Sequence, residues 1–137
     1  AVSAGMVHNL ALTTDGSVWS WGDGAFGRLG HGDTQDQPLP KKVEAFAERS
    51  VVAFSAGGSH SLALTADGSV WGWGFGLHGQ LGHDDQQTQP LPKKIEAFAG
   101  QHVVAVSAGG YHSFATTADG SVWSWGEGGF GQLGHGD

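Results

Sequence analysis

The chain has 137 residues, with 6 Lys or Arg against 13 Asp or Glu, so its formal net charge is −7. An acidic chain without basic runs argues against a nucleic-acid phosphate backbone as the partner. It has no cysteine, which excludes disulfides and thiolate chemistry, and no apolar run approaches the roughly 18 residues of a membrane-spanning helix. Its 25 glycines accompany 6 tryptophans, a combination that predicts short strands joined by tight turns.

The sequence repeats with a period of 52 residues. Ser3-Ala4-Gly5 returns as Ser55-Ala56-Gly57 and as Ser107-Ala108-Gly109, and no insertion or deletion separates the copies. A fixed period of this size indicates an array of one supersecondary unit. We therefore divide the chain into repeats at 3–54 and 55–106 and a truncated repeat at 107–137. Because both ends fall inside a unit, we expect a piece of a longer array or one that other blades or copies complete.

The middle repeat predicts four strands in chain order. Residues 51–56 are β-branched and aromatic, and residues 60–65 alternate apolar with small or polar side chains. Asp67-Gly68 is a strong hairpin signal before the strand at 70–74. The fourth segment, 90–98, contains two prolines that cannot donate to a ladder, so we place it at a sheet edge. Residues 96–99 at its end can form a single helical turn, too short to stand alone.

Four antiparallel strands per unit predict an all-β fold made of β-propeller blades, here a partial propeller. Each blade has two tryptophans at i and i+2, which lie on one face of a strand. We expect them to fill the gap between neighbouring blades as its structural core, because each can bury on the order of 150–250 Å². The six are Trp19, Trp21, Trp71, Trp73, Trp123 and Trp125.

These blocks resemble the regulator-of-chromosome-condensation repeat over the whole chain. The resemblance is carried by Ser55-Ala56-Gly57-Gly58-Ser59-His60, Asp67-Gly68-Ser69-Val70-Trp71, Trp73-Gly74 and Gly79-Gln80-Leu81-Gly82-His83. Kelch repeats have a similar length, but the Ser-Ala-Gly and Leu-Gly-His blocks fit them poorly. The resemblance implies a seven-bladed propeller of which this chain covers less than half, and it favours an intracellular location.

Three motifs that suggest chemistry are better explained by structure. Residues 22–27 match G-x-G-x-x-G, yet no helix follows to face a pyrophosphate, so we expect no nucleotide or other cofactor. The periodic histidines lack metal-ligand spacing, and we expect their ring nitrogens to satisfy local backbone groups. Asp15, Asp67 and Asp119 each precede Gly in a hairpin and bond their own backbone. We therefore expect no catalytic residue, no metal site and no enzyme.

Function is expected in the loops, where the internal copies differ most. The copies vary after the tryptophan strand, at the first turn and before the first strand, whereas the framework is nearly fixed. Loops on a rigid scaffold are the usual binding surface, and exposed aromatics and Arg are favoured anchors. The candidate partner contacts are Phe26, Arg28, Phe75, Leu77, His78, Tyr111 and Phe130. The alternative is that Phe26, Leu77 and Phe130 only pack between blades.

The leading hypothesis is a non-enzymatic scaffold that presents blade loops to a protein partner. By resemblance, a guanine-nucleotide exchange module for a small GTPase is the alternative, although the unbroken period leaves no room for an inserted loop. Light sensing, which a plant member of this fold performs with tryptophans in turns, is disfavoured because the corresponding turns here contain Ser59 and Tyr111. A self-assembling array, in which copies associate through the open ends, is a further possibility.

Overall fold

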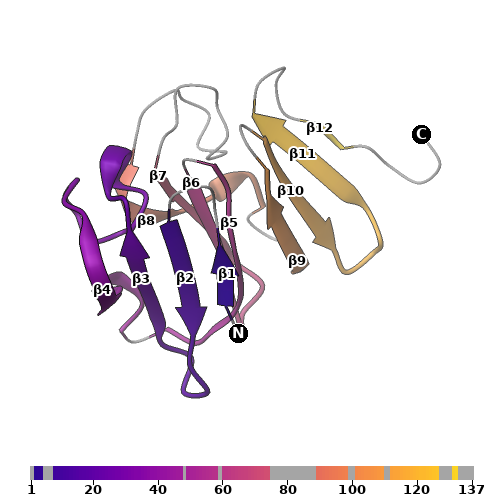
Figure 1. Cartoon of the computed structure of the whole chain (residues 1–137). Coiled ribbons are helices and arrows are strands. Elements are labelled where there is room, and N and C mark those ends of the chain that lie inside the picture. The colour runs from indigo at the N-terminus through magenta and orange to yellow at the C-terminus, as the bar shows by residue number, and fades with distance from the viewer. Residues whose placement is uncertain are drawn as a thin grey trace.

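The structure of the chain is a computed structural model that describes residues 2–4, 8–47, 49–58, 60–74, 89–98, 101–109, 112–126 and 131–132. It contains three antiparallel sheets, with strand orders β1-β2-β3-β4, β5-β6-β7-β8 and β12-β11-β10-β9 (Figure 1). Each sheet is one blade, named here the first, second and third blade in chain order. The all-β fold built from four-stranded propeller blades is therefore confirmed.

The strand bounds follow the repeat. The first blade contains β1 (Val2–Ala4), β2 (His8–Leu12), β3 (Val18–Gly22) and β4 (Gln37–Lys42). The second contains β5 (Val51–Ala56), β6 (His60–Thr65), β7 (Val70–Gly74) and β8 (Gln89–Lys94). The third contains β9 (Val103–Ala108), β10 (His112–Thr117), β11 (Val122–Gly126) and β12 (Gly131–Gln132). Three single-turn 3₁₀ helices are η1 (Ala25–Gly27), η2 (Glu44–Phe46) and η3 (Glu96–Phe98).

The Asp-Gly hairpin between the second and third strands of a blade is built from side-chain hydrogen bonds. Asp67 Oδ1 accepts from the Ser69 amide at 3.1 Å and from the Thr65 hydroxyl at 2.7 Å. Gly68 adopts φ +85°, which L side chains rarely adopt. The same bonds recur around Asp15 and Asp119. The three aspartates are therefore turn-forming residues, as their spacing predicts.

The proline-containing strands β4 and β8 lie at the outer edge of their blades, where a missing backbone donor costs no ladder bond. The fourth segment consists of an edge strand followed by a single helical turn, as its sequence predicts. β8 ends at Lys94, after which the Ile95 amide donates to the Val70 carbonyl and the chain turns into η3. This turn aims Phe98 away from its own sheet and toward the next blade.

The hydrophobic core lies between blades rather than within them. At the first junction, Phe46 of η2 meets Trp71 and Trp73 of the second blade, with ring centroids 5.8 and 5.6 Å apart. Leu10 and Ala63 fill the rest of this junction and are fully buried. The second junction repeats the pattern with Phe98, Trp123 and Trp125. The second and third blades therefore each present a tryptophan face to the blade before them.

One tryptophan of the first blade has a different environment. Trp21 is only half-buried, whereas Trp73 and Trp125 at the same framework position are 0% and 1% exposed. The described residues contain no blade on that side of the first sheet. Trp21 therefore lacks the neighbour that buries its counterparts, whereas Trp19, Trp71 and Trp123 are all half-buried.

Candidate functional site

The loop that follows the tryptophan strand in the first blade, residues 23–36, is the most completely described of the copy-variable loops. Of the seven residues predicted as partner contacts, Arg28 lies in it with its side chain described. Phe26 belongs to η1, although its side chain is outside the described part. The other five lie outside the described residues: Phe75, Leu77, His78, Tyr111 and Phe130.

Arg28 connects this loop to the second blade. Its side chain is 5% exposed, its Nε donates to the Ala25 carbonyl at 2.8 Å, and its Nη1 lies 3.5 Å from the Gly58 carbonyl. Its own carbonyl accepts from the Ser61 hydroxyl at 3.0 Å. In this chain Arg28 therefore orients the loop against the neighbouring blade and exposes little surface to a partner.

A histidine and a serine from successive blades form a buried pair next to Arg28. His8 Nε2 lies 2.9 Å from Ser61 Oγ, and His60 Nε2 lies 2.9 Å from Ser113 Oγ one blade later. Because the Ser61 hydroxyl already donates to Arg28, its oxygen must accept from His8, which therefore carries its proton on Nε2. We expected these rings to bond local backbone groups, whereas the Nε2 atoms bond serine side chains of the next blade.

The electrostatics of His8 keep it neutral. Burial lowers its pKa from 6.5 to about 4, and the nearby Arg28 charge acts in the same direction. A neutral imidazole suits this position, since its Nε2–H donates across the junction and burial together with Arg28 outweighs the opposing charge of Asp23. This pair is a structural connection between blades.

The end of the loop approaches the second blade closely. Gly30 has φ +81°, and a Cβ placed there would lie 2.8 Å from Nε1 of Trp73. Leu29 is buried beside it, and His31 Nε2 lies 2.9 Å from the Ser20 hydroxyl within the first blade. The Leu-Gly-His block is therefore a packing element, and its glycine is required by close contact with a tryptophan.

Beyond this packed base the loop is exposed. Residues 32–36 are all exposed and contain Asp33 and Asp36. Asp36 Oδ1 accepts from the Gly24 amide at 2.9 Å and closes the loop, while Asp33 Oδ1 accepts from the Gln35 amide. The loop thus has an anchored base and an acidic, solvent-facing rim.

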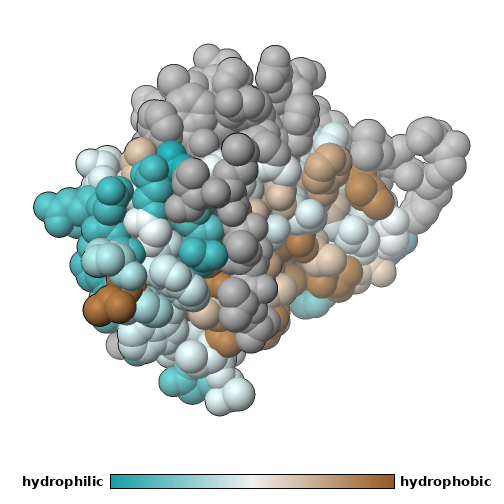
Figure 2. Space-filling view, viewed as in Figure 1, coloured by the Kyte–Doolittle hydropathy of each residue, from teal (hydrophilic) through white to brown (hydrophobic). Residues whose placement is uncertain are grey.

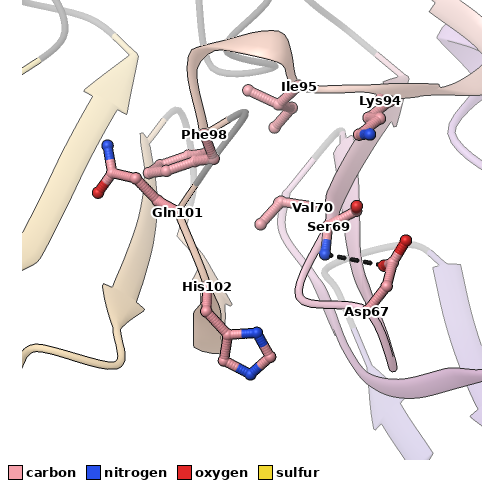
Figure 3. A pocket seen from close by; sticks show the side chains of 8 residues that line it. All are labelled: Asp67, Ser69, Val70, Lys94, Ile95, Phe98, Gln101 and His102. Carbon is pink, nitrogen blue, oxygen red and sulfur yellow. Dashed lines mark hydrogen bonds between the residues drawn. The ribbon is translucent and has the colours of Figure 1, made fainter.

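The opposite end of the second blade carries a cavity of about 380 Å³ (Figure 3). The hairpin side chains Asp67 and Ser69 lie on one side of it, and Phe98 with His102 on the other. The remaining lining residues are Val70, Lys94, Ile95 and Gln101. Hydrogen bonds from Thr65 and Ser69 lower the pKa of Asp67, and they hold its carboxylate in the hairpin turn.

Neither end of the blades carries a metal centre among the described residues, where no three His, Asp or Glu side chains group closely enough to hold an ion. Within the same part of the chain, no helix has the length and apolar character needed to cross a membrane.

A model of the Regulator of chromosome condensation (RCC1) repeat matches residues 15–64 and 67–116, and a second model of the same repeat matches residues 1–28, 51–80 and 103–132. The human E3 ubiquitin-protein ligase HERC2 is 43% identical over 99% of this chain and 3% of its own length. The Ultraviolet-B receptor UVR8 of Arabidopsis thaliana is 37% identical over 99% of this chain and 31% of its own.

The crystal structure of Prp20p from Saccharomyces cerevisiae, whose title names its binding to Gsp1p and histones, superimposes with a TM-score of 0.80. It is 30% identical, and the match covers 93% of this chain and 32% of Prp20p. The chain thus spans at most about a third of these relatives.

Proposed function

Because the chain belongs to the Regulator of chromosome condensation (RCC1) repeat family, we propose that it is a non-enzymatic scaffold that presents blade loops to a protein partner. The observation that carries the proposal is the loop at 23–36, whose base is fixed across the blade junction while residues 32–36 face solvent. Variable loops on rigid elements are typical of binding surfaces. No enzymatic chemistry is needed for this role.

The proposed contact surface combines the exposed rim at 32–36 with the aromatic and histidine side chains of the copy-variable loops. The candidates are Phe26, Phe75, Leu77, His78, Tyr111 and Phe130. Arg28 is assigned a positioning role, because its guanidinium is directed at the Gly58 carbonyl of the second blade. The acidic rim favours a partner with complementary basic side chains.

The test is quantitative co-purification with the wild-type chain and with a Phe75→Ala, His78→Ala double variant. We expect specific proteins to be lost with the double variant while the thermal midpoint stays unchanged. Thr14→Asp is the matched control, because Thr14 is exposed at the Asp15 hairpin, outside the copy-variable loops. If no protein depends on the loop residues more than on Thr14, the scaffold proposal is wrong.

A guanine-nucleotide exchange module is the second candidate, favoured by the similarity to Prp20p. The measurement is the release of a fluorescent guanine nucleotide from Gsp1p with and without the chain. Release accelerated by the wild-type chain but not by the double variant would replace the scaffold proposal with exchange activity. An unchanged release rate would remove this candidate.

The similarity to UVR8 gives less support to light sensing. All six tryptophans lie on the framework strands β3, β7 and β11, where they serve blade packing. Ultraviolet illumination is therefore expected to leave the assembly state of the chain unchanged, which sedimentation before and after illumination would measure.

A further inference from the structure

The cavity between the Asp67 hairpin and the segment before the third blade has the size of a small-ligand site. Its volume of about 380 Å³ falls within the roughly 300–1,000 Å³ common among such sites. Its lining comes from the β6–β7 hairpin, the end of β8, η3 and residues 101–102. The walls therefore belong to one internal junction, at the end of the blade opposite the loop that follows the tryptophan strand.

The base of this cavity is apolar. Val70, Ile95 and Phe98 are at most 3% exposed, and Figure 3 shows Val70 and Ile95 between the hairpin side and the side of residues 101–102. An apolar group placed there exchanges water for aliphatic contacts, which is favourable. Apolar contact alone selects no particular ligand, since hydrophobic side chains also gather on the surface over β9, β10 and β11, on the right of Figure 2. Selectivity must come from the polar lining.

Two opposite charges, Asp67 and Lys94, stand on the same side of the cavity (Figure 3). Hydrogen bonds from Thr65 and Ser69 lower the pKa of Asp67, and the Lys94 charge acts in the same direction, so Asp67 is ionised at neutral pH. Both hairpin bonds end on Oδ1, and an ionised carboxylate can accept further donors on its second oxygen. Within the described part of the chain, the Lys94 ammonium makes no hydrogen bond or ion pair. The lining therefore offers one anion and one cation that can each bind a ligand group.

The opposite wall is specific to this junction. Gln101 and His102 stand where the first repeat has Arg49 and Ser50. The His102 ring lies so close to Gly68 that a Cβ added to this glycine would collide with it, which closes the cavity on the hairpin side. The first junction combines the same hairpin sequence with a smaller side chain and an additional cation. It therefore provides a comparison within the same molecule.

We infer that this cavity binds a free apolar α-amino acid in its zwitterionic form. The ligand carboxylate pairs with Lys94 and the ligand ammonium with Asp67, while the aliphatic side chain lies on the apolar base. A ligand with only one of these charges leaves a charge of the lining without a partner at a partly desolvated site, which lowers affinity. The end of a peptide carries only one of the two charges, so the lining favours a free amino acid.

The experiment is isothermal titration calorimetry of the 137-residue chain with L-leucine, L-valine and L-phenylalanine as probes. We expect saturable binding of at least one of them. Leucinamide keeps only the ammonium and N-acetyl-leucine only the carboxylate, so each should bind at least about tenfold more weakly than leucine. The absence of saturable binding by all three amino acids would overturn the inference. N-acetyl-leucine or leucinamide binding as well as leucine would also overturn it, because the cavity would then take a peptide end.

Single substitutions test the two charges. Lys94→Met and Asp67→Asn should each weaken leucine binding at least about tenfold, and Asn retains Oδ1 as an acceptor for the hairpin bonds. Lys42→Met and Asp15→Asn change the corresponding residues of the first blade and should leave binding unchanged. Thermal unfolding establishes that each variant is folded. Folded Lys94→Met and Asp67→Asn chains that bind leucine as tightly as the wild type would contradict the assigned contacts.

A double variant tests the location. Gln101→Arg with His102→Ser gives the second junction the residues of the first, a combination that the first repeat already contains beside the same hairpin sequence. We expect an unchanged thermal midpoint and loss of leucine binding. A folded double variant with wild-type affinity would show that leucine binds elsewhere. This inference goes beyond the proposed function, and none of its outcomes bears on loop-dependent partner binding, whose variants lie at the other end of the blade.

Discussion

His8 Nε2 lies 2.9 Å from Oγ of Ser61 on the next blade, and both side chains are fully buried. The Ser61 hydroxyl donates a hydrogen bond to the carbonyl of Arg28 at 3.0 Å. A strand of the first blade, a strand of the second and the variable loop of the first are thus linked through one serine. The stability of the loop base is therefore inseparable from the packing of the two blades.

Ser61→Ala tests this link. The substitution leaves the His8 Nε2–H and the Arg28 carbonyl without their partner in a buried site, and such a loss costs about 1–3 kcal/mol. Urea unfolding followed by tryptophan fluorescence measures the change. Ser50→Ala is the control, because Ser50 is exposed and surface changes are usually within about 0.5 kcal/mol. Equal stabilities of the two variants would show that the buried bond contributes nothing.

The pKa of His8 predicts a stability that falls in mild acid. Burial and Arg28 lower the folded-state pKa from 6.5 to about 4, so between these values the unfolded chain binds more protons than the folded one. The contribution of His8 to the free energy of unfolding is therefore fully present above pH 6.5. It declines as the pH falls toward about 4, by at most about 3 kcal/mol, because each pKa unit corresponds to about 1.36 kcal/mol. Unfolding free energies across this range measure it.

The variant His8→Gln isolates this contribution, because Gln can donate to Ser61 but does not titrate. Burial also lowers the pKa of His31, so His31→Gln should remove a separate part of the same slope. The Thr13 hydroxyl and the Ser17 amide lower the pKa of Asp15 to about 2, so Asp15 changes the pH dependence of stability only below pH 4. A slope between pH 4 and 6.5 that is identical in wild type and His8→Gln would contradict the assignment.

The strands and hairpins could be predicted from sequence because their signals are local. Residues 51–56, 60–65 and 70–74 are strands as the alternation and the Asp67-Gly68 turn predict. The single turn expected at 96–99 is present as η3, which follows the end of β8 at Lys94. The packing of Phe98 on the third blade is decided by tertiary contacts, which local propensity does not encode.

The histidine–serine pairs could not be predicted in the same way. Their partners are 53 residues apart and meet only once the relative position of two blades is fixed. The period does contain a weak signal, because His60 and His112 recur together with Ser61 and Ser113. In the first repeat Asn9 replaces the serine, which hides the pattern. The burial of Arg28 likewise depends on the Gly58 carbonyl of a neighbouring blade.

Gly30→Ala should destabilise the chain through two effects. Its φ of +81° disfavours any L side chain, and the added Cβ would lie 2.8 Å from Nε1 of Trp73. Gly32→Ala is a matched control, with φ +85° but with its Cβ 3.3 Å from the flexible Leu91 Cδ2. The backbone term is about 1–2 kcal/mol in both, and overpacking adds about 1–3 kcal/mol at Gly30. Thermal or urea unfolding should therefore show a clearly lower free energy of unfolding for Gly30→Ala than for Gly32→Ala. Equal losses would show that the Trp73 side chain shifts to accommodate the added Cβ at no cost.

Trp73→Ala and Trp21→Ala compare one framework position with and without a preceding blade. Trp73 is 0% exposed and packs on Phe46 at a centroid distance of 5.6 Å, whereas Trp21 is half-buried. Truncating a buried tryptophan costs about 3–5 kcal/mol, a large share of the 5–15 kcal/mol typical of a domain. We expect Trp73→Ala to unfold the array cooperatively at a much lower urea concentration than the wild type. Trp21→Ala should lose clearly less free energy of unfolding when both variants are measured at low protein concentration. The two residues share the same strand position and differ within the sheet in their cross-strand partner, Asn9 for Trp21 and Ser61 for Trp73, so the difference reports mainly the blade junction. Equal losses would mean that the tryptophans stabilise their own blades and that the junctions contribute little.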